Sequence, residues 1–144
     1  MTTLLLPVER VDLALPLPPP EAGGNDRGHS IYRSKVRKWI KQDAYLVARS
    51  VMAQHPGTWE PWTPVVITYR WVGKTLNMPD PDNVVSRAKP VLDGIVEAGL
   101  IADDSRAHVS FAPVVYEKDK DNPRLVVEIE RVMDRAAETE GWDE

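Results

Sequence analysis

Residues 64–72, with the sequence PVVITYRWV, decide the predicted fold of this 144-residue chain. β-Branched and aromatic side chains fill the stretch, and this composition is typical of a β-strand. Ahead of it, residues 30–54 repeat apolar side chains at helical spacing behind Ser30, a residue type that favours the helix N-cap. The side chains expected to form the buried face of this helix are Val36, Trp39, Ile40, Val47, Val51 and Met52.

A second helix is predicted downstream of that strand, over residues 82–98. Gly99 suits its C-terminal end, because glycine adopts the left-handed conformation in which many helices stop. Pro90 lies inside the helix and should kink or split it, since proline lacks a backbone N–H and clashes with the preceding turn.

Three outer stretches predict further strands, over residues 8–15, 107–116 and 124–132. A charged turn of residues 118–123 joins the last two, so we expect them to pair as a β-hairpin. The resulting order β-α-β-α-β-β is typical of an α/β (α+β) fold, in which a single mixed sheet of about four strands packs against two main helices.

The charge distribution separates a domain from a tail. Residues 1–131 hold all the predicted elements except the last residue of the final strand, and they fit one domain with its own hydrophobic core. Residues 132–144 contain five acidic residues and one basic residue, and we expect them to form a flexible acidic tail. The tail accounts for the whole net charge of −4, so the remaining chain is neutral and the overall charge does not exclude a nucleic-acid partner.

Composition excludes several classes of site. The chain has no cysteine, which rules out disulfides, thiolate zinc sites and a cysteine nucleophile. No apolar run reaches the roughly 18–20 residues of a membrane helix, and residues 1–7 lack the basic start of a secretory signal. We therefore expect no membrane partner and a cytoplasmic location.

The motif PDPDN, residues 79–83, holds Asp80 and Asp82 in a stretch that its prolines stiffen. A second acidic pair, Asp103 and Asp104, follows about twenty residues later. Carboxylate oxygens suit Mg²⁺ or Mn²⁺, and one or two such ions would activate water and neutralise phosphate charge during phosphodiester hydrolysis. Two simpler interpretations stay open: Asp82 could be only a helix N-cap, and the second pair could be only a surface turn.

Lys89 and Asp93 lie between the two acidic pairs. Steps of seven and four residues return to nearly the same helix face, so Asp82, Lys89 and Asp93 should share one stripe. A lysine there could stabilise charge that develops on a phosphate or a leaving oxygen. An exposed ion pair one helical turn apart is the simpler alternative.

Basic residues crowd the start of the first predicted helix, within fifteen positions of the chain. They are Arg27, Arg33, Lys35, Arg37, Lys38 and Lys41. Such a run is usually a solvated helix face, and contact with DNA phosphates is the alternative.

Taken together, these motifs resemble the RusA-type Holliday-junction resolvases. The likeness rests on the D-x-D-N of residues 80–83, and on Lys89 with its intervals to Asp93 and Asp104. The early sequence LPLPP, residues 15–19, and the long helix after it extend the likeness to about residues 8–131.

The resemblance implies a homodimeric, Mg²⁺-dependent endodeoxyribonuclease that cuts two opposed strands of a four-way DNA junction symmetrically, in DNA recombination and repair. Phages and prophages often encode such enzymes. Carried over by position, the catalytic residues are Asp80, Asp82, Lys89 and Asp104. The implied metal ligands are Asp80, Asp82 and Asp104, with Asp103 and Asp93 as supporting acids. The six basic residues above and Arg87 would then contact DNA phosphates.

One spacing departs from that family. Lys89 follows Asp82 by seven residues, whereas four separate them in the best-known members, so a regular helix sets the lysine about 4.5 Å further along its axis. From the residues alone, two other functions stay open: a protein that binds junction DNA without cutting it, and a metal-dependent nucleotide hydrolase.

Overall fold

The structure, a computed structural model, describes residues 8–23 and 30–132. Both Arg27 and the acidic tail beyond residue 132 lie outside this part of the chain. In chain order, the elements are β1 (Val8–Leu15), the short 3₁₀ helix η1 (Pro20–Ala22), α1 (Ser30–Ala53), β2 (Val65–Gly73), α2 (Pro81–Ala98), β3 (Val109–Phe111), β4 (Val115–Lys118) and β5 (Arg124–Val132). The predicted α+β class, with two helices against one mixed sheet, is confirmed.

The sheet has five strands, with β5 between β1 and β2. β5 pairs antiparallel with both neighbours, whereas β3 and β4 pair parallel with successive parts of β2, along its other edge. The predicted hairpin is therefore wrong. Both edges of β5 are occupied along its length, so β4 lies on the far side of β2 and has no edge of β5 to pair with.

The predicted strand over residues 107–116 is also interrupted. It forms β3 and β4 with residues 112–114 between them. Pro113 falls in this gap, and because proline has no backbone N–H it cannot donate to a strand ladder. The break lets the chain pair with two separate portions of β2.

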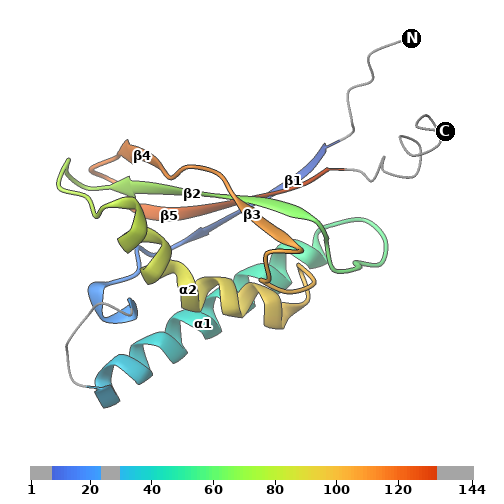
Figure 1. The fold of residues 1–144 in the computed structure, drawn as a ribbon, viewed down its shortest axis with the longest axis horizontal. Coiled ribbons are helices and arrows are strands. Elements are labelled where there is room, and N and C mark those ends of the chain that lie inside the picture. Colours follow the sequence, from blue (N-terminus) through green and yellow to red (C-terminus); the bar gives the residue numbers. More distant parts are fainter. Residues whose placement is uncertain (1–7, 24–29, 133–144) are drawn as a thin grey trace, which may run out of the picture.

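Both helices cover the same face of the sheet (Figure 1). Alternate residues of β2, such as Ile67 and Tyr69, are buried beneath the helices, as are Val127 and Ile129 of β5. The hydrophobic core therefore lies between one sheet face and the two helices. Trp62 and Trp71 belong to it, as expected for large aromatic residues.

Trp39 does not belong to the core, contrary to the predicted buried face of the first helix. Its side chain is 56% exposed. Figure 1 shows α1 running obliquely, with its N-terminal turns away from the sheet. Val36 in those turns is buried, so Trp39 is exposed because it lies on the outer side of the helix, in line with Leu46, which is 60% exposed. The fully buried positions of α1 nearer the sheet are instead the small residues Ala44 and Ala48.

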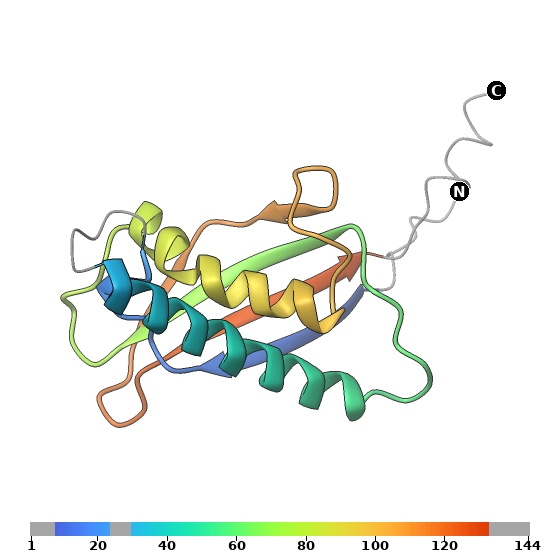
Figure 2. The same cartoon turned by 90° about the horizontal axis from the view of Figure 1, so that it is seen from below.

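α1 and α2 approach each other very closely at Gly94. A Cβ atom on Gly94 would overlap the backbone carbonyl oxygen of Lys41 and would lie 2.9 Å from the Cβ of Ala44. The two helices lie side by side across the sheet in the view of Figure 2. α2 runs unbroken from Pro81 to Ala98, so Pro90 does not split it, and Gly99 ends it with the expected positive φ of 87°.

No helix of the described segments is long and apolar enough to cross a lipid bilayer.

Replacing Gly94 with alanine tests the helix contact. We expect Gly94→Ala to lower the free energy of unfolding by about 1–3 kcal/mol, because the added methyl group must push two packed backbones apart. Urea denaturation measures this change. Gln42→Ala on the exposed side of α1 is the control and should stay within about 0.5 kcal/mol of the wild type. A Gly94→Ala protein as stable as the wild type would contradict the close contact.

Candidate functional site

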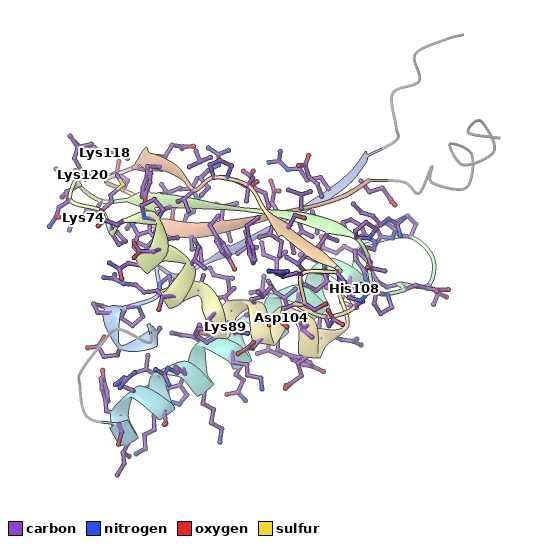
Figure 3. The ribbon with its side chains drawn as sticks, in the orientation of Figure 1. Lys74, Lys89, Asp104, His108, Lys118 and Lys120 are labelled. Carbon is purple, nitrogen blue, oxygen red and sulfur yellow. The ribbon has the colours of Figure 1, made fainter. Side chains whose placement is uncertain are left out.

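Lys89 joins two acidic side chains from different parts of the chain. Its ammonium group donates hydrogen bonds to Asp93 Oδ1 at 2.8 Å and to Asp104 Oδ2 at 2.6 Å. Asp93 lies one turn further along α2, whereas Asp104 comes from the loop after that helix. Figure 3 shows Lys89 and Asp104 next to each other beneath the sheet. The simple exposed pair of Lys89 with Asp93 is therefore only part of the arrangement.

The loop that carries Asp104 is anchored by backbone hydrogen bonds. Trp62, just before β2, donates to the Leu100 carbonyl at 2.9 Å and accepts from the Ala102 N–H at 3.0 Å. Leu100 and Ile101 are buried between these bonds. Because the chain is fixed immediately before residues 103 and 104, this anchor sets where the second acidic pair begins.

Asp103 bonds to partners other than Lys89. Its Oδ1 accepts a hydrogen bond from the Ser105 backbone N–H at 2.8 Å, and its Oδ2 lies 3.6 Å from Nε2 of His108. The bond from Ser105 lowers the pKa of the Asp103 carboxyl below its ordinary value of 3.8. His108 also contacts Thr63 Oγ1 through Nδ1, at 2.6 Å. Asp103 therefore shapes the turn, and sequence spacing gave no sign of its contact with His108.

The surroundings of Lys89 keep it charged. The hydrogen bonds that Lys89 donates to Asp104 and then to Asp93 raise the pKa of Lys89 above its ordinary value of 10.5. Tyr69 of β2 is 2% exposed, and burial followed by the negative charge of the same two acids raises its pKa as well. At neutral pH, the group contains one ammonium, two carboxylates and a protonated phenol nearby.

Asp80 and Asp82 lie at the other end of α2. Asp80 is the N-cap residue, and its carbonyl oxygen accepts from the N–H groups of Asn83 and Val84 at 2.9 and 3.0 Å. The interpretation of Asp82 as the N-cap is therefore wrong. Asp82 lies in the first turn, where the helix dipole stabilises a negative charge. Pro81 is the first residue of the helix, and the Asp80 side chain makes no cap hydrogen bond.

Tyr116 of β4 lies beside this first acidic pair. Its hydroxyl group donates to the Pro79 carbonyl at 2.7 Å. Partial burial, and then the charges of Asp80 and Asp82, raise the pKa of Tyr116. An open pocket of about 370 Å³ is lined by Asp80, Tyr116 and Lys118, so Asp80 borders a space that a ligand can enter.

The five acids are not gathered into one cluster. Across residues 8–23 and 30–132, no three His, Asp or Glu side chains lie together in a group that could hold a metal ion. Asp82 and Lys89 are separated by roughly 10 Å of helix rise. Lys89 unites Asp93 and Asp104, and Asp80 and Asp82 form a separate exposed pair.

The exposed pair fits a hard divalent cation by the chemistry of its donors. Mg²⁺ is usually held by one or two carboxylates, with waters and substrate phosphates completing the coordination. Within the described residues, no cationic side chain forms an ion pair with Asp80 or Asp82. These two carboxylates could therefore supply the protein's share of such a site, whereas Asp93 and Asp104 already share the ammonium group of Lys89.

The basic residues of α1 divide into two sets. Arg33 and Arg37 extend to the Gly23 carbonyl at 3.4 and 3.5 Å, and Lys41 pairs with Glu97 of α2 at 2.9 Å. Lys35 and Lys38 are exposed. On α2, the guanidinium group of Arg87 lies over the Trp71 ring, 5.8 Å from its centroid. The basic side chains thus project from both helices.

A scan against protein-family models finds no match to this chain, and a search of curated proteins finds none either.

The pKa of Lys89 provides a direct test of the three-residue contact. We expect Asp104→Asn to lower this pKa and Asp93→Asn to lower it less, since Asp104 makes the stronger bond. A titration of the lysine Cε signals by NMR measures both values, with Asp119→Asn in the distant β4–β5 turn as the control. An unchanged Lys89 pKa in Asp104→Asn would contradict the contact.

The same shift fixes the pH range over which the contact favours folding. Folding raises the pKa of Lys89 above 10.5. The contribution of the contact to the free energy of unfolding is therefore complete below that pH and is lost as the pH rises through the folded-state pKa. The stability difference between wild type and Asp104→Asn should therefore be constant near neutral pH and shrink at strongly alkaline pH.

Proposed function

We propose that this protein is a divalent-metal-dependent endodeoxyribonuclease that resolves four-way junctions and other branched DNA. The observation that supports this most is the 2.6 Å contact between Lys89 and Asp104, with Asp93 on the same ammonium group. These three residues occupy the positions that the likeness to RusA-type resolvases assigns to one active site. The fold joins them although 15 residues separate Lys89 from Asp104.

In the proposed site, Asp80 and Asp82 are the first ligands for Mg²⁺ or Mn²⁺, with Asp104 as a further catalytic acid and Asp103 and Asp93 in support. When bound, such an ion neutralises phosphate charge and makes a water molecule more acidic. Lys89 contributes a fixed positive charge that stabilises negative charge on the phosphate or the leaving oxygen. Its raised pKa keeps this ammonium group protonated throughout the neutral pH range.

The proposed enzyme acts as a homodimer on DNA in the cytoplasm. Two active sites related by a two-fold axis would meet the two symmetry-related strands of a junction. The contacts with DNA phosphates would come from Arg33, Lys35, Arg37, Lys38, Lys41 and Arg87, together with Arg27. Binding should therefore weaken steeply as salt is added.

A synthetic four-way junction with a label on each strand tests the activity. With Mg²⁺, we expect cuts at symmetric positions in two opposed strands, seen on a denaturing gel, and nicked products that a ligase seals. Without a divalent ion, no strand should be cut. Uncut strands together with a clear mobility shift would instead indicate a junction-binding protein. Turnover of free nucleotides without any action on DNA would indicate a nucleotide hydrolase.

Asp82→Asn separates cutting from binding. We expect it to slow junction cleavage by about 100-fold or more, because it removes a negatively charged ligand and leaves the shape unchanged. Junction affinity, measured by mobility shift in Ca²⁺, should stay within a few-fold of the wild type. Asp12→Asn is the matched control, since Asp12 pairs with Arg10 on β1 and lies outside the proposed site. Full cleavage by Asp82→Asn would remove Asp82 from the mechanism.

A further inference from the structure

An open pocket of about 640 Å³ lies between α1 and α2. Cationic side chains line it from both helices: Arg37, Lys38 and Lys41 from α1, and Lys89 from α2. The acid that shares the lining is Asp93, which shares the Lys89 ammonium group with Asp104. This pocket therefore carries net positive charge and favours an anionic ligand.

Two of these cations keep their charge uncompensated. Lys41 pairs with Glu97, and Lys89 pairs with its two aspartates. Over the chain segments that the structure describes, no carboxylate lies within ion-pair distance of Arg37 or Lys38. Arg37 instead donates to the neutral Gly23 carbonyl at 3.5 Å. A phosphate group in the pocket would meet both of these charges.

Two aromatic side chains of α1 are exposed outside the pocket lining. Trp39 is 56% exposed and Tyr32 is 52% exposed, and both lie among the exposed lysines of the same helix. Lys35 lies one turn before Trp39, and Lys38 directly precedes it. Exposed aromatic rings beside a cationic groove are the combination with which proteins hold single-stranded nucleic acid, because bases stack on the rings and phosphates follow the charge.

We propose that the α1 face binds an unpaired strand segment, with a base stacked on Trp39 and a backbone phosphate in the pocket at Arg37 and Lys38. Charge complementarity favours this occupant, since a basic surface of this kind repels an identical basic surface on a second copy. The inference rests on the proposed function, because a branch point in DNA is where bases become unpaired. It adds a strand-binding surface that adjoins the proposed active site at Lys89 and Asp93.

The test uses the full-length protein and a labelled oligothymidylate of about twelve nucleotides, a length that suits a small single-strand site. Fluorescence anisotropy in EDTA measures binding without any cutting. We expect Trp39→Ala to weaken binding roughly tenfold, the loss of one stacked base. Trp39→Phe should keep most of the affinity while losing the quenching of tryptophan emission by the bound strand. Leu46→Ala is the control, because Leu46 is an equally exposed apolar residue of α1, 60% exposed, without a ring.

Salt dependence tests the phosphate part. Lys38→Gln should reduce the slope of log affinity against log salt by roughly 0.7, the value for one phosphate of a single strand. Lys120→Gln should leave the slope unchanged. Figure 3 shows Lys120 with Lys74 and Lys118 at one end of the sheet, apart from Lys89, which lines the pocket. An equal effect of both substitutions would contradict a specific role for the pocket.

Three results would overturn the inference. One is a Trp39→Ala protein that binds the oligonucleotide as tightly as the wild type does. Another is a Lys38→Gln protein whose binding is the same as that of the wild type. The third is a Trp39→Ala protein that loses its dimer in analytical ultracentrifugation but keeps its DNA affinity, which would assign the patch to a second copy. Junction cleavage is scored separately. Junction cleavage together with oligonucleotide binding that does not depend on Trp39 contradicts only this inference. Binding that depends on Trp39, without junction cleavage, contradicts only the nuclease proposal.

Discussion

The close approach of α1 and α2 at Gly94 is the constraint on which the rest of the structure depends. There is no room for a side chain between Gly94 and the α1 backbone at Lys41. This contact fixes α1 along α2, and so it brings the cationic residues of α1 beside Lys89 and creates the pocket between the helices. It also leaves the N-terminal turns of α1 away from the sheet, with Trp39 exposed. The packing of the two helices, the pocket between them and the exposure of Trp39 thus follow from the same backbone contact.

The electrostatics of the site follow from where α2 begins and ends. Asp80 is its N-cap residue and borders an open pocket beside Tyr116, and Asp82 lies in its first turn. The loop after its last turn is held by Trp62 and delivers Asp104 to Lys89. The helix therefore has an exposed pair of carboxylates at its start, and further along it carries Lys89, which is bonded to Asp93 on the helix and to Asp104 on the loop. A phosphate near both would meet hard ligands for a cation and a fixed ammonium group, which are the two kinds of charge stabilisation that phosphodiester hydrolysis needs.

Local patterns in the sequence predict most of the elements, and failures occur where distant parts of the chain compete. Both helices and strands β1, β2 and β5 have the predicted type and nearly the predicted bounds, because apolar periodicity, Gly99 and the turn residues act locally. The hairpin prediction fails because closeness in sequence does not decide which strand edge is available, and here β1 and β2 occupy both edges of β5. The predicted burial of Trp39 fails because apolar spacing does not decide which side of the helix faces the core, and Trp39 shares the outer side with Leu46. At the site, the step of four predicts the Lys89–Asp93 pair, whereas the contact with Asp104 depends on the loop anchored at Trp62 and followed only from family resemblance.

Anomalous scattering from Mn²⁺ in crystals of the protein with a four-way junction tests the nuclease account most directly. The account predicts a strong anomalous peak coordinated by the carboxylates of Asp80 and Asp82, with a DNA phosphate oxygen completing the shell and the ammonium group of Lys89 nearby. A junction bound in the crystal with no manganese on either aspartate, or with manganese only at acids outside this region, would contradict it.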